Sequence, residues 1–206
     1  MAKTASSRKW LARQQTDPYV KRAQREGYRS RAAYKLLEIQ EKDRILRPGL
    51  RVVDLGAAPG SWSQIAARLV GRGGRVVALD LLPMTPLPGV VLLQGDVREP
   101  AVLEELVTQL DGAPLDLLLS DMAPNITGLS AVDQPRSIHL VEIALELVRE
   151  RLQPGGVFVV KAFQGEGFDQ MLADIRQSFQ RVVTRKPKSS RPQSRELYLV
   201  AKGFHP

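Results

Sequence analysis

The sequence predicts an α/β fold in which helices cover both faces of a mostly parallel sheet. Three observations support this prediction. Short apolar segments of strand length alternate along the chain with segments whose apolar residues have helical spacing. A glycine-rich turn joins one of the strands directly to a helix, as in nucleotide-binding folds. Acidic residues follow several of the strands, which is where an open parallel sheet binds its ligands.

The length and composition indicate one globular domain over residues 1–206. Of the 206 residues, 43% are hydrophobic, which is enough for a full core. No apolar run approaches the length of a membrane span, so we expect a soluble, cytoplasmic protein without a membrane partner. The absence of cysteine excludes disulfides and any thiol nucleophile, including covalent attack on C5 of a pyrimidine. With only two histidines, we expect no metal site.

Basic residues are concentrated at the two ends of the chain. Residues 1–35 contain ten Lys and Arg against two acidic residues, and residues 176–206 contain eight against one. The segment between them contains 12 basic and 19 acidic residues. Basic ends on an acidic body indicate a surface that binds a polyanion, and a solvated basic tail without a partner is the alternative.

Residues 1–29 are expected to form a flexible basic arm that binds RNA. Its aromatic residues Trp10, Tyr19 and Tyr28 can stack on unpaired bases while the cations between them neutralise phosphates. Alternatively, these rings anchor the segment to the core. The same composition allows a transit peptide, and with it an organellar location. The cations interleaved with the rings are Lys9, Arg13, Lys21, Arg22, Arg25 and Arg29.

A helix is predicted over residues 31–43, with Ser30 as its N-cap. Its apolar side chains fall on one face of a helical wheel, with Glu38 and Glu41 on the opposite face. Lys35 lies at the edge of the apolar face, where a lysine normally extends to solvent. The pattern by itself therefore gives Lys35 no function.

The segment 52–66 is the most informative motif. A buried strand at 52–55 leads through a turn bounded by Gly56 and Gly60 into a helix at 61–70. We expect this turn to present backbone N–H groups and the positive end of the helix to a ligand. A tight turn that needs small residues and binds nothing is the alternative.

The same turn indicates the kind of ligand. It lacks the middle glycine of the G-x-G-x-x-G motif, and Pro59 has no N–H, so a pyrophosphate is disfavoured. Asp54, at the end of the strand, favours a ligand that carries a cationic amine. S-adenosylmethionine, with an ammonium, a sulfonium and a carboxylate, meets this description.

Further aspartates lie at or just after the ends of later strands, and we expect their side chains to converge with Asp54. Asp80 is placed to bind ribose hydroxyls. Asp96 is placed to accept from an adenine amino group, or alternatively to serve as a turn or cap residue before a helix at 101–110. Asp121 begins the turn after the last of these strands. The strands are predicted at 75–80, 90–93 and 115–120.

The C-terminal half supplies one strong candidate residue. Lys161 directly follows a buried strand, where a lysine is costly unless it is paired or functional. Glu196 begins the last strand, where a lone charged residue is usually solvated. The predicted elements are helices at 136–151 and 168–179 and strands at 157–160, 181–184 and 195–202.

Several blocks of sequence, in a fixed order, together resemble one known family, the bacterial FtsJ-type 2′-O-methyltransferases of large-subunit ribosomal RNA. The blocks are VVDLGAAPGSWSQ (52–64), DLLPM (80–84), LQGD (93–96), SDMAPN (120–125), VVKAFQGEGF (159–168) and SRELYLVAKG (194–203), with SRKWLARQ and RSRAAYKLLEIQ (29–40) nearer the start. The resemblance implies a Rossmann-like class I methyltransferase with a seven-stranded sheet and S-adenosylmethionine as the methyl donor.

The resemblance also assigns roles to residues. It implies a catalytic tetrad of Lys35, Asp121, Lys161 and Glu196. A neutral Lys161 would accept the proton of a ribose hydroxyl, while Asp121 and Glu196 orient the two lysines. At position 61 the family more often has glycine than serine. The cofactor-binding residues implied by matching are Gly60, Trp62, Asp80, Asp96 and Asp121, to which the turn itself adds Asp54 and Gly56.

The implied substrate is a uridine ribose in the peptidyl-transferase region of 23S-type ribosomal RNA, presented in the assembled 50S subunit. We expect a monomer, since nothing in the sequence suggests an obligate dimer. Transfer RNA is the main alternative substrate. A base N-methyltransferase, a nicotinamide-dependent dehydrogenase and a non-catalytic ribosome-assembly protein are the alternative classes. The turn Met122-Ala123-Pro124-Asn125 argues against the first, because N-methyltransferases resemble each other in a Pro-Pro-aromatic turn there.

Overall fold

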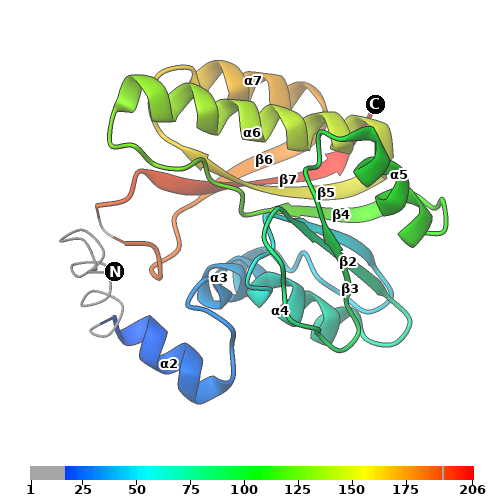
Figure 1. Cartoon of the computed structure of the whole chain (residues 1–206). Helices are drawn as coiled ribbons and strands as arrows, with labels where there is room; N and C mark the ends of the chain where they lie inside the picture. The colour runs from blue at the N-terminus through cyan, green and yellow to red at the C-terminus, as the bar shows by residue number, and fades with distance from the viewer. Residues whose placement is uncertain (1–16, 192) are drawn as a thin grey trace.

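Seven strands form one sheet in the order β3-β2-β1-β4-β5-β7-β6 (Figure 1). The computed structural model describes residues 17–191 and 193–206. The neighbouring strands β3, β2, β1, β4 and β5 run parallel to one another, whereas β7 is antiparallel to both β5 and β6. The predicted fold class is therefore confirmed. The strands are β1 (Arg51–Leu55), β2 (Arg75–Asp80), β3 (Val91–Gln94), β4 (Leu115–Ser120), β5 (Leu152–Phe163), β6 (Phe179–Arg185) and β7 (Glu196–Phe204).

Helices cover both faces of the sheet and divide the core into two layers. Apolar side chains of α3 and α4 pack on one face, and those of α5, α6 and α7 pack on the other (Figure 1). Because strands β1 and β4 are covered on both faces, most of their residues are buried, and the buried ones are apolar apart from Asp54 and Ser120. The helices are α2 (Pro18–Glu26), α3 (Ala33–Asp43), α4 (Ser61–Val70), α5 (Pro100–Gln109), α6 (Ser130–Arg151) and α7 (Phe168–Gln177).

The register of the central strands determines which side chains meet at the edge of the sheet. Ser120, the last residue of β4, pairs with Val160 of β5, so the residues that follow them lie side by side. In the antiparallel pair, Lys161 lies opposite Tyr198, and Phe163 lies opposite Glu196. Alternation along each strand places the side chains of Lys161, Phe163, Glu196 and Tyr198 on the face covered by α3 and α4.

The N-terminal segment differs from the flexible arm that the sequence predicts. From residue 17 onward it contains helix α2, whose N-cap Asp17 accepts a hydrogen bond from the N–H of Tyr19 at 3.0 Å. The rings of Tyr19 and Tyr28 pack against Tyr34 of α3, at centroid distances of 5.4 and 5.7 Å. The alternative that these two rings anchor the segment is therefore confirmed. Trp10 lies outside the described residues.

Two helix starts also differ from the prediction. Helix α3 begins at Ala33, because Ser30 and Arg31 accept hydrogen bonds from residues three positions later and so form a tighter turn. Helix α6 begins at Ser130 although Pro135 follows. The carboxylate of Asp133 stabilises this first part, since it accepts hydrogen bonds from the loop residues before the helix.

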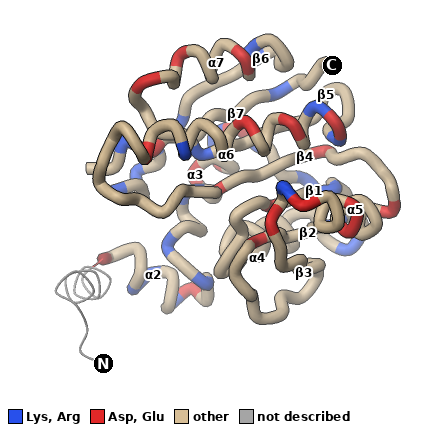
Figure 2. The backbone as a smooth tube through the Cα atoms, turned by 45° about the horizontal axis from the view of Figure 1, so that its top comes forward, with Lys and Arg blue, Asp and Glu red and all other residues tan. Residues whose placement is uncertain are grey.

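Charged residues of both signs occur along the described helices (Figure 2). Figure 2 shows Lys and Arg along α2 and Asp and Glu recurring along α6 and α7. The basic segment before β7 lies against α3, where the carboxylate of Glu38 accepts hydrogen bonds from the N–H groups of Lys188 and Ser189 at 2.6 and 2.9 Å. None of the helices in the described part of the chain combines the length and the apolar composition that a membrane span requires.

Asp43 is predicted to stabilise the fold through Arg185. The guanidinium donates two hydrogen bonds of 2.8 Å to the carboxylate, which is 6% exposed, and so joins the end of α3 to the edge strand β6. Asp43→Ala leaves a partly buried guanidinium without its partner, and we expect it to lower the free energy of unfolding by about 2 kcal/mol in urea titrations. The control is Asp174→Ala, which breaks an exposed pair with Arg149 and should cost at most about 1 kcal/mol. Equal losses in the two variants would contradict this assignment.

Candidate active site

The backbone of the glycine-rich turn is satisfied within the protein. The N–H groups of Gly56 and Ala57 donate to the carbonyl of Leu79, that of Ala58 to the carboxylate of Asp80, and that of Gly60 to the carbonyl of Ala57. Pro59 has no N–H. The expectation that these N–H groups are offered to a ligand is therefore wrong for this turn. Because a pyrophosphate needs such donors, this geometry argues against a dinucleotide.

The two glycines of the turn are required by close approaches. Gly56 has φ +69°, and a Cβ there would lie 2.8 to 2.9 Å from atoms of Met122. Gly60 has φ +101°, and a Cβ there would lie 2.7 Å from Leu87 and 3.1 Å from the guanidinium of Arg29. The turn is thus packed tightly against the loops that follow β4 and β2.

A small cavity of about 10 Å³ lies beside this turn, and Asp54 and Asp121 are the acidic residues that line it. Asp54 is fully buried, and its Oδ2 accepts the hydroxyl hydrogen bond of Ser63 at 2.5 Å, whereas its Oδ1 has no hydrogen-bond partner. Burial raises the pKa of Asp54 to about 7; the bond from Ser63 opposes this rise and the charge of Asp121 adds to it. The cavity is lined by Ser30, Ala32, Asp54, Gly56, Ala57, Ala58, Pro59, Ser61, Trp62 and Asp121.

The unpaired oxygen of Asp54 fits a ligand with a cationic amine. A buried carboxylate oxygen without a partner carries a desolvation cost, which a bound ammonium would offset. The same ammonium would also lower the pKa of Asp54 again. These observations fit the sort of ligand that the sequence predicts here.

The four predicted aspartates lie along the same edge of the sheet, with different surroundings. Asp54 and Asp121 line the small cavity. Asp80 accepts hydrogen bonds of 2.8 Å from the N–H groups of Ala58 and Leu82 and so shapes the cavity wall. The residue before Asp96 donates its N–H to the carbonyl of Asp80 at 3.0 Å, which brings Asp96 to the same edge.

Asp96 is engaged locally. Its carboxylate accepts hydrogen bonds from the backbone N–H and the guanidinium of Arg98, and these bonds hold the pKa of Asp96 down to about 2. This is the turn role that the sequence analysis gives as the alternative to adenine binding. Asp96 therefore stays ionised at neutral pH.

Trp62 connects the small cavity with the core. It is 2% exposed, its indole N–H donates to the carbonyl of Ala32 at 2.9 Å, and its ring lies 5.5 Å from that of Tyr198. Trp62 therefore fixes the start of α3 against the first turn of α4 in addition to lining the cavity.

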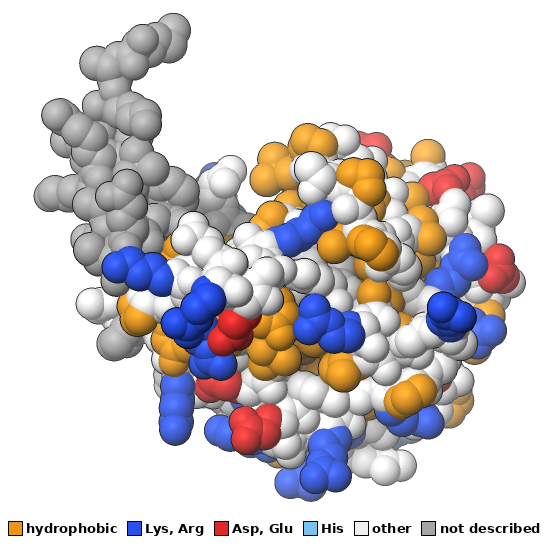
Figure 3. All heavy atoms as spheres, turned by 90° about the horizontal axis from the view of Figure 1, so that it is seen from below, with side chains coloured by type: hydrophobic (Ala, Val, Ile, Leu, Met, Phe, Trp, Pro, Cys, Tyr) orange, Lys and Arg blue, Asp and Glu red, His pale blue; other side chains and the backbone are white. Residues whose placement is uncertain are grey.

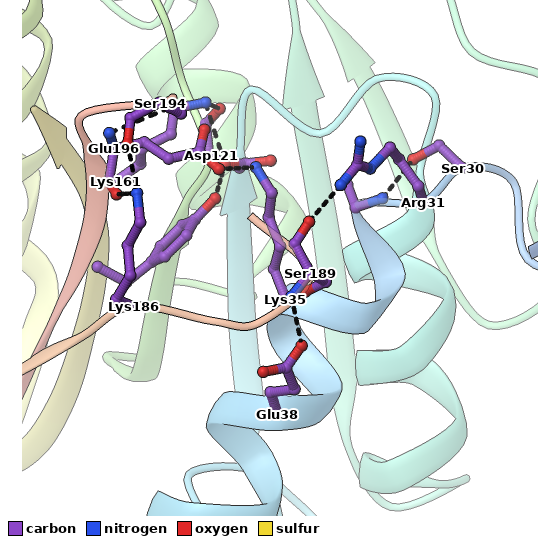
Figure 4. A network of polar contacts seen from close by, with 12 residues as sticks. Ser30, Arg31, Lys35, Glu38, Asp121, Lys161, Lys186, Ser189, Ser194 and Glu196 are labelled. Atoms are coloured by element: carbon purple, nitrogen blue, oxygen red, sulfur yellow. Dashed lines mark hydrogen bonds and ion pairs between the residues drawn. The ribbon is translucent and has the colours of Figure 1, made fainter. Parts of the chain in front are cut away.

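The four residues implied as a tetrad lie together in one polar network (Figure 4). Lys161 Nζ lies 3.0 Å from Asp121 Oδ1 and also donates to the carbonyl of Asp121 at 2.5 Å. Lys35 Nζ lies 2.8 Å from Glu196 Oε1, and both side chains are 13% exposed. The expectations that Lys35 extends to solvent and that Glu196 is solvated are thus wrong, because each supplies the partner that lets the other be buried.

Tyr198 belongs to this network, and the sequence analysis missed it. Its hydroxyl donates to Asp121 Oδ1 at 2.7 Å, and Lys35 Nζ lies 5.6 Å from the centre of its ring. Burial raises the pKa of Tyr198 well above its usual value, so the hydroxyl remains a donor at neutral pH. The signal was available, since alternation along the last strand places Tyr198 on the same face as Glu196.

The charge state of Glu196 follows from its neighbours. Burial acts to raise the pKa of Glu196, but the charge and hydrogen bond of Lys35 outweigh it, with a smaller contribution from Lys161, and the pKa lies below its usual value. Glu196 is therefore an anion at neutral pH, and the network contains two lysines and two carboxylates.

A second, larger cavity lies on the other side of the network. Its volume is about 920 Å³, within the range of ligand pockets. Lys35, Lys161 and Glu196 line it, as do Arg31 and Arg191, and Ser30 and Ala32 belong to the walls of both cavities. Figure 3 shows Lys and Arg side chains spread over the face of the molecule on which α2, α3 and α4 lie.

This arrangement suits the transfer of a group from a cationic ligand to an anionic one. The pair formed by Asp121 and Lys161 joins the cavity with an unpaired carboxylate to the cavity with basic walls. Among residues 17–191 and 193–206, no cluster of His, Asp or Glu side chains is arranged to hold a metal ion.

The fold and the site define a Rossmann-like methyltransferase, and comparison with known proteins identifies the family. The model of the FtsJ-like methyltransferases matches residues 28–204. The chain therefore belongs to the FtsJ-like methyltransferase family, and the resemblance noted in the sequence is confirmed.

Relatives and solved structures agree with this assignment. The chain is 56% identical over 204 residues to a Stutzerimonas stutzeri protein and 58% identical over 198 residues to an Alkalilimnicola ehrlichii protein, both named ribosomal RNA large subunit methyltransferase E. These alignments cover 99% and 96% of this chain and 99% and 95% of the relatives. A Plasmodium falciparum structure described as a putative ribosomal RNA methyltransferase is 31% identical, with a TM-score of 0.78 over 86% of this chain and 98% of its own.

Asp54 is predicted to make stability depend on pH. Its pKa is about 7 in the folded protein and about 3.9 in an unfolded chain, so the folded state holds one proton more between these values. Stability should therefore fall with rising pH in this window, by about 1.4 kcal/mol per pH unit. Urea titrations of the wild type and Asp54→Asn from pH 5 to pH 8 measure this, because the asparagine cannot titrate. The variant should gain stability relative to the wild type up to about pH 7, and a constant difference would show that Asp54 stays ionised.

Proposed function

We propose that this protein transfers a methyl group from S-adenosylmethionine to the ribose 2′-hydroxyl of a uridine in 23S-type large-subunit ribosomal RNA, presented in the assembled 50S subunit. The observation that carries the proposal is the pair of Asp121 and Lys161, which lies where the two cavities meet. Family membership and the printed names of the relatives support the reaction class and the RNA. The proposed substrate places the protein in the cytoplasm, and we propose that it acts as a monomer.

The residues in and around the small cavity have the chemistry that S-adenosylmethionine requires. The unpaired Oδ1 of Asp54 would suit its ammonium group, and Asp121, which lines the same cavity, would add a second negative charge beside a cationic ligand. Asp80 would bind the ribose hydroxyls and Asp96 the adenine amino group, since each carboxylate oxygen can accept more than one hydrogen bond. Trp62, Gly56 and Gly60 complete the site. When bound, S-adenosylmethionine supplies a methyl group that is activated by its positively charged sulfur.

The polar network then acts on the hydroxyl that receives the methyl group. Lys161 Nζ contacts the 2′-oxygen and, in its neutral form, takes up the hydroxyl proton. Removal of this proton is needed because a ribose hydroxyl is a very weak acid, and such proton transfer contributes about 10² to 10⁴ in rate. Asp121 and Tyr198 fix the direction of Lys161, and Glu196 keeps Lys35 at the cavity wall. Orientation of the oxygen for in-line displacement supplies much of the remaining acceleration.

The larger cavity and the surface around it suit RNA. Arg31, Lys35 and Arg191 line the cavity. Because Arg31 and Lys35 are paired with Asp17 and Glu196, we assign the phosphate beside the target ribose to Arg191. Basic residues of α2 and of the segment 186–191 extend this surface (Figure 2). We therefore propose that the N-terminal segment binds RNA even though the part from residue 17 onward is an ordered helix.

A methyl-transfer assay tests the substrate. Large ribosomal subunits from cells that lack the enzyme, free ribosomal RNA and transfer RNA are each incubated with S-adenosylmethionine labelled in its methyl group. We expect label on the subunits at one nucleotide, whose linkage resists alkaline cleavage because the 2′-oxygen is blocked. Label on transfer RNA alone would replace the substrate and keep the chemistry. Bound cofactor without any transfer would indicate a non-catalytic assembly protein.

Lys161→Arg tests the proton-accepting role. A guanidinium keeps the positive charge but cannot give up its proton at neutral pH, so we expect kcat to fall at least 100-fold, with cofactor affinity within about threefold of the wild type. The control is Lys42→Arg, which makes the same change at an exposed position of α3 and should leave kcat unchanged. Near-normal turnover of the Lys161 variant would show that Lys161 positions the hydroxyl without taking its proton.

A further inference from the structure

The segment that joins α2 to α3 passes along both cavities. Ser30 and Ala32 line the small cavity and the large one. Ser30 Oγ lies 2.7 Å from Ser61 Oγ at the start of α4, and the hydrogen bonds of Arg31 to Asp17 and to the carbonyl of Ser189 hold the segment to the basic loop before β7. The segment thus belongs to the structure of the site and not only to the basic surface.

Arg29 makes the most specific contacts of this segment. One guanidinium nitrogen, NH1, donates to the carbonyls of Pro59 at 2.9 Å and Thr85 at 2.8 Å, and the other, NH2, donates to the carbonyl of Pro86 at 2.7 Å. Pro59 belongs to the glycine-rich turn, and Thr85 and Pro86 belong to the loop between β2 and β3. A single side chain therefore joins the two loops that follow β1 and β2.

The loop between β2 and β3 depends on an external donor. Three of its residues, Pro83, Pro86 and Pro88, have no backbone N–H, so the loop has few donors of its own for its carbonyl groups. An arginine supplies a planar, rigid set of N–H groups that can bond several carbonyls at once. The contact is also close, because a Cβ on Gly60 would lie 3.1 Å from NH1 of Arg29 and 2.7 Å from Leu87 of the loop.

We propose that Arg29 is a positioning residue for cofactor binding, which holds the glycine-rich turn and the loop 81–90 at the separation that the cofactor requires. The inference rests on the proposed function for the identity of the cofactor. It also changes the role that the sequence suggests for Arg29, because three of its hydrogen bonds go to the protein that forms the cofactor site. Arg29 acts through Pro59, which lines the small cavity. It also acts through the loop that begins after Asp80.

The binding of S-adenosylmethionine without RNA measures this role directly. Isothermal titration calorimetry is carried out on the wild type, Arg29→Ala, Arg29→Lys and the control Arg25→Ala, which removes an exposed positive charge from the same segment. We expect the dissociation constant to rise about tenfold or more in Arg29→Ala and by a smaller factor in Arg29→Lys, whose ammonium cannot reproduce the planar set of donors. Arg25→Ala should bind as the wild type does.

Steady-state kinetics separates positioning from RNA binding. We expect both Arg29 variants to raise KM for S-adenosylmethionine, with kcat at saturating cofactor and KM for the large subunit within about twofold of the wild type. If KM for the large subunit rises instead and cofactor affinity is unchanged, Arg29 is an RNA contact and the proposal is overturned.

Two further results keep the inference distinct from stability and from the proposed function. Circular dichroism melts show whether the variants are folded at the temperature of the titrations. If Arg29→Ala is unfolded at that temperature, Arg29→Lys, which keeps the charge, is used in its place. A lower melting temperature with an unchanged dissociation constant overturns the proposal. Failure of the wild type itself to bind S-adenosylmethionine would refute the proposed cofactor, whereas equal binding by the wild type and both Arg29 variants would refute this inference alone.

Discussion

The burial of Lys161 is the constraint on which the site depends. A lysine that is almost excluded from solvent is stable in a fold only when its charge and its hydrogen-bond donors are matched. Asp121 provides both matches, through its carboxylate and its carbonyl. The register of the sheet makes this meeting unavoidable, since the pairing of Ser120 with Val160 leaves Asp121 and Lys161 as the next residues of adjacent parallel strands.

The parts of the fold that the sequence predicts well are those with a local signal. The strands at 75–80 and 115–120 and the helix at 61–70 have the predicted bounds, because their apolar runs are limited by glycine or by charged residues. Lys161 could also be singled out, since a charge next to a run of buried apolar residues is conspicuous, although β5 continues to Phe163 and so contains Lys161 instead of ending before it. The hydrogen bonding of the glycine-rich turn could not be predicted, because the spacing of glycines does not reveal where each backbone N–H points.

The rest of the site depends on contacts between distant segments. Lys35 and Glu196 look unremarkable in their own surroundings, and they meet because α3 packs on the face to which β7 brings its first residues. The surface that both basic segments are expected to form for a polyanion stays a prediction. Within the described residues, Arg31 and Glu38 hydrogen-bond to the basic loop before β7, which ties part of the N-terminal basic segment to this loop.

The position of the antiparallel strand β7 in the sheet determines when the site can form during synthesis of the chain. Glu196 and Tyr198 belong to β7, which follows β6 in the chain, yet β7 lies between β5 and β6, and in the described sheet β6 is hydrogen-bonded to β7 alone. A nascent chain that has emerged from the ribosome only as far as β6 already contains both lysines and Asp121. It lacks the partner of Lys35, the cross-strand neighbour of Lys161 and the attachment of β6. The site is therefore completed only after β7 has been synthesised, and a polypeptide that ends between β6 and Glu196 has an open sheet edge at β5.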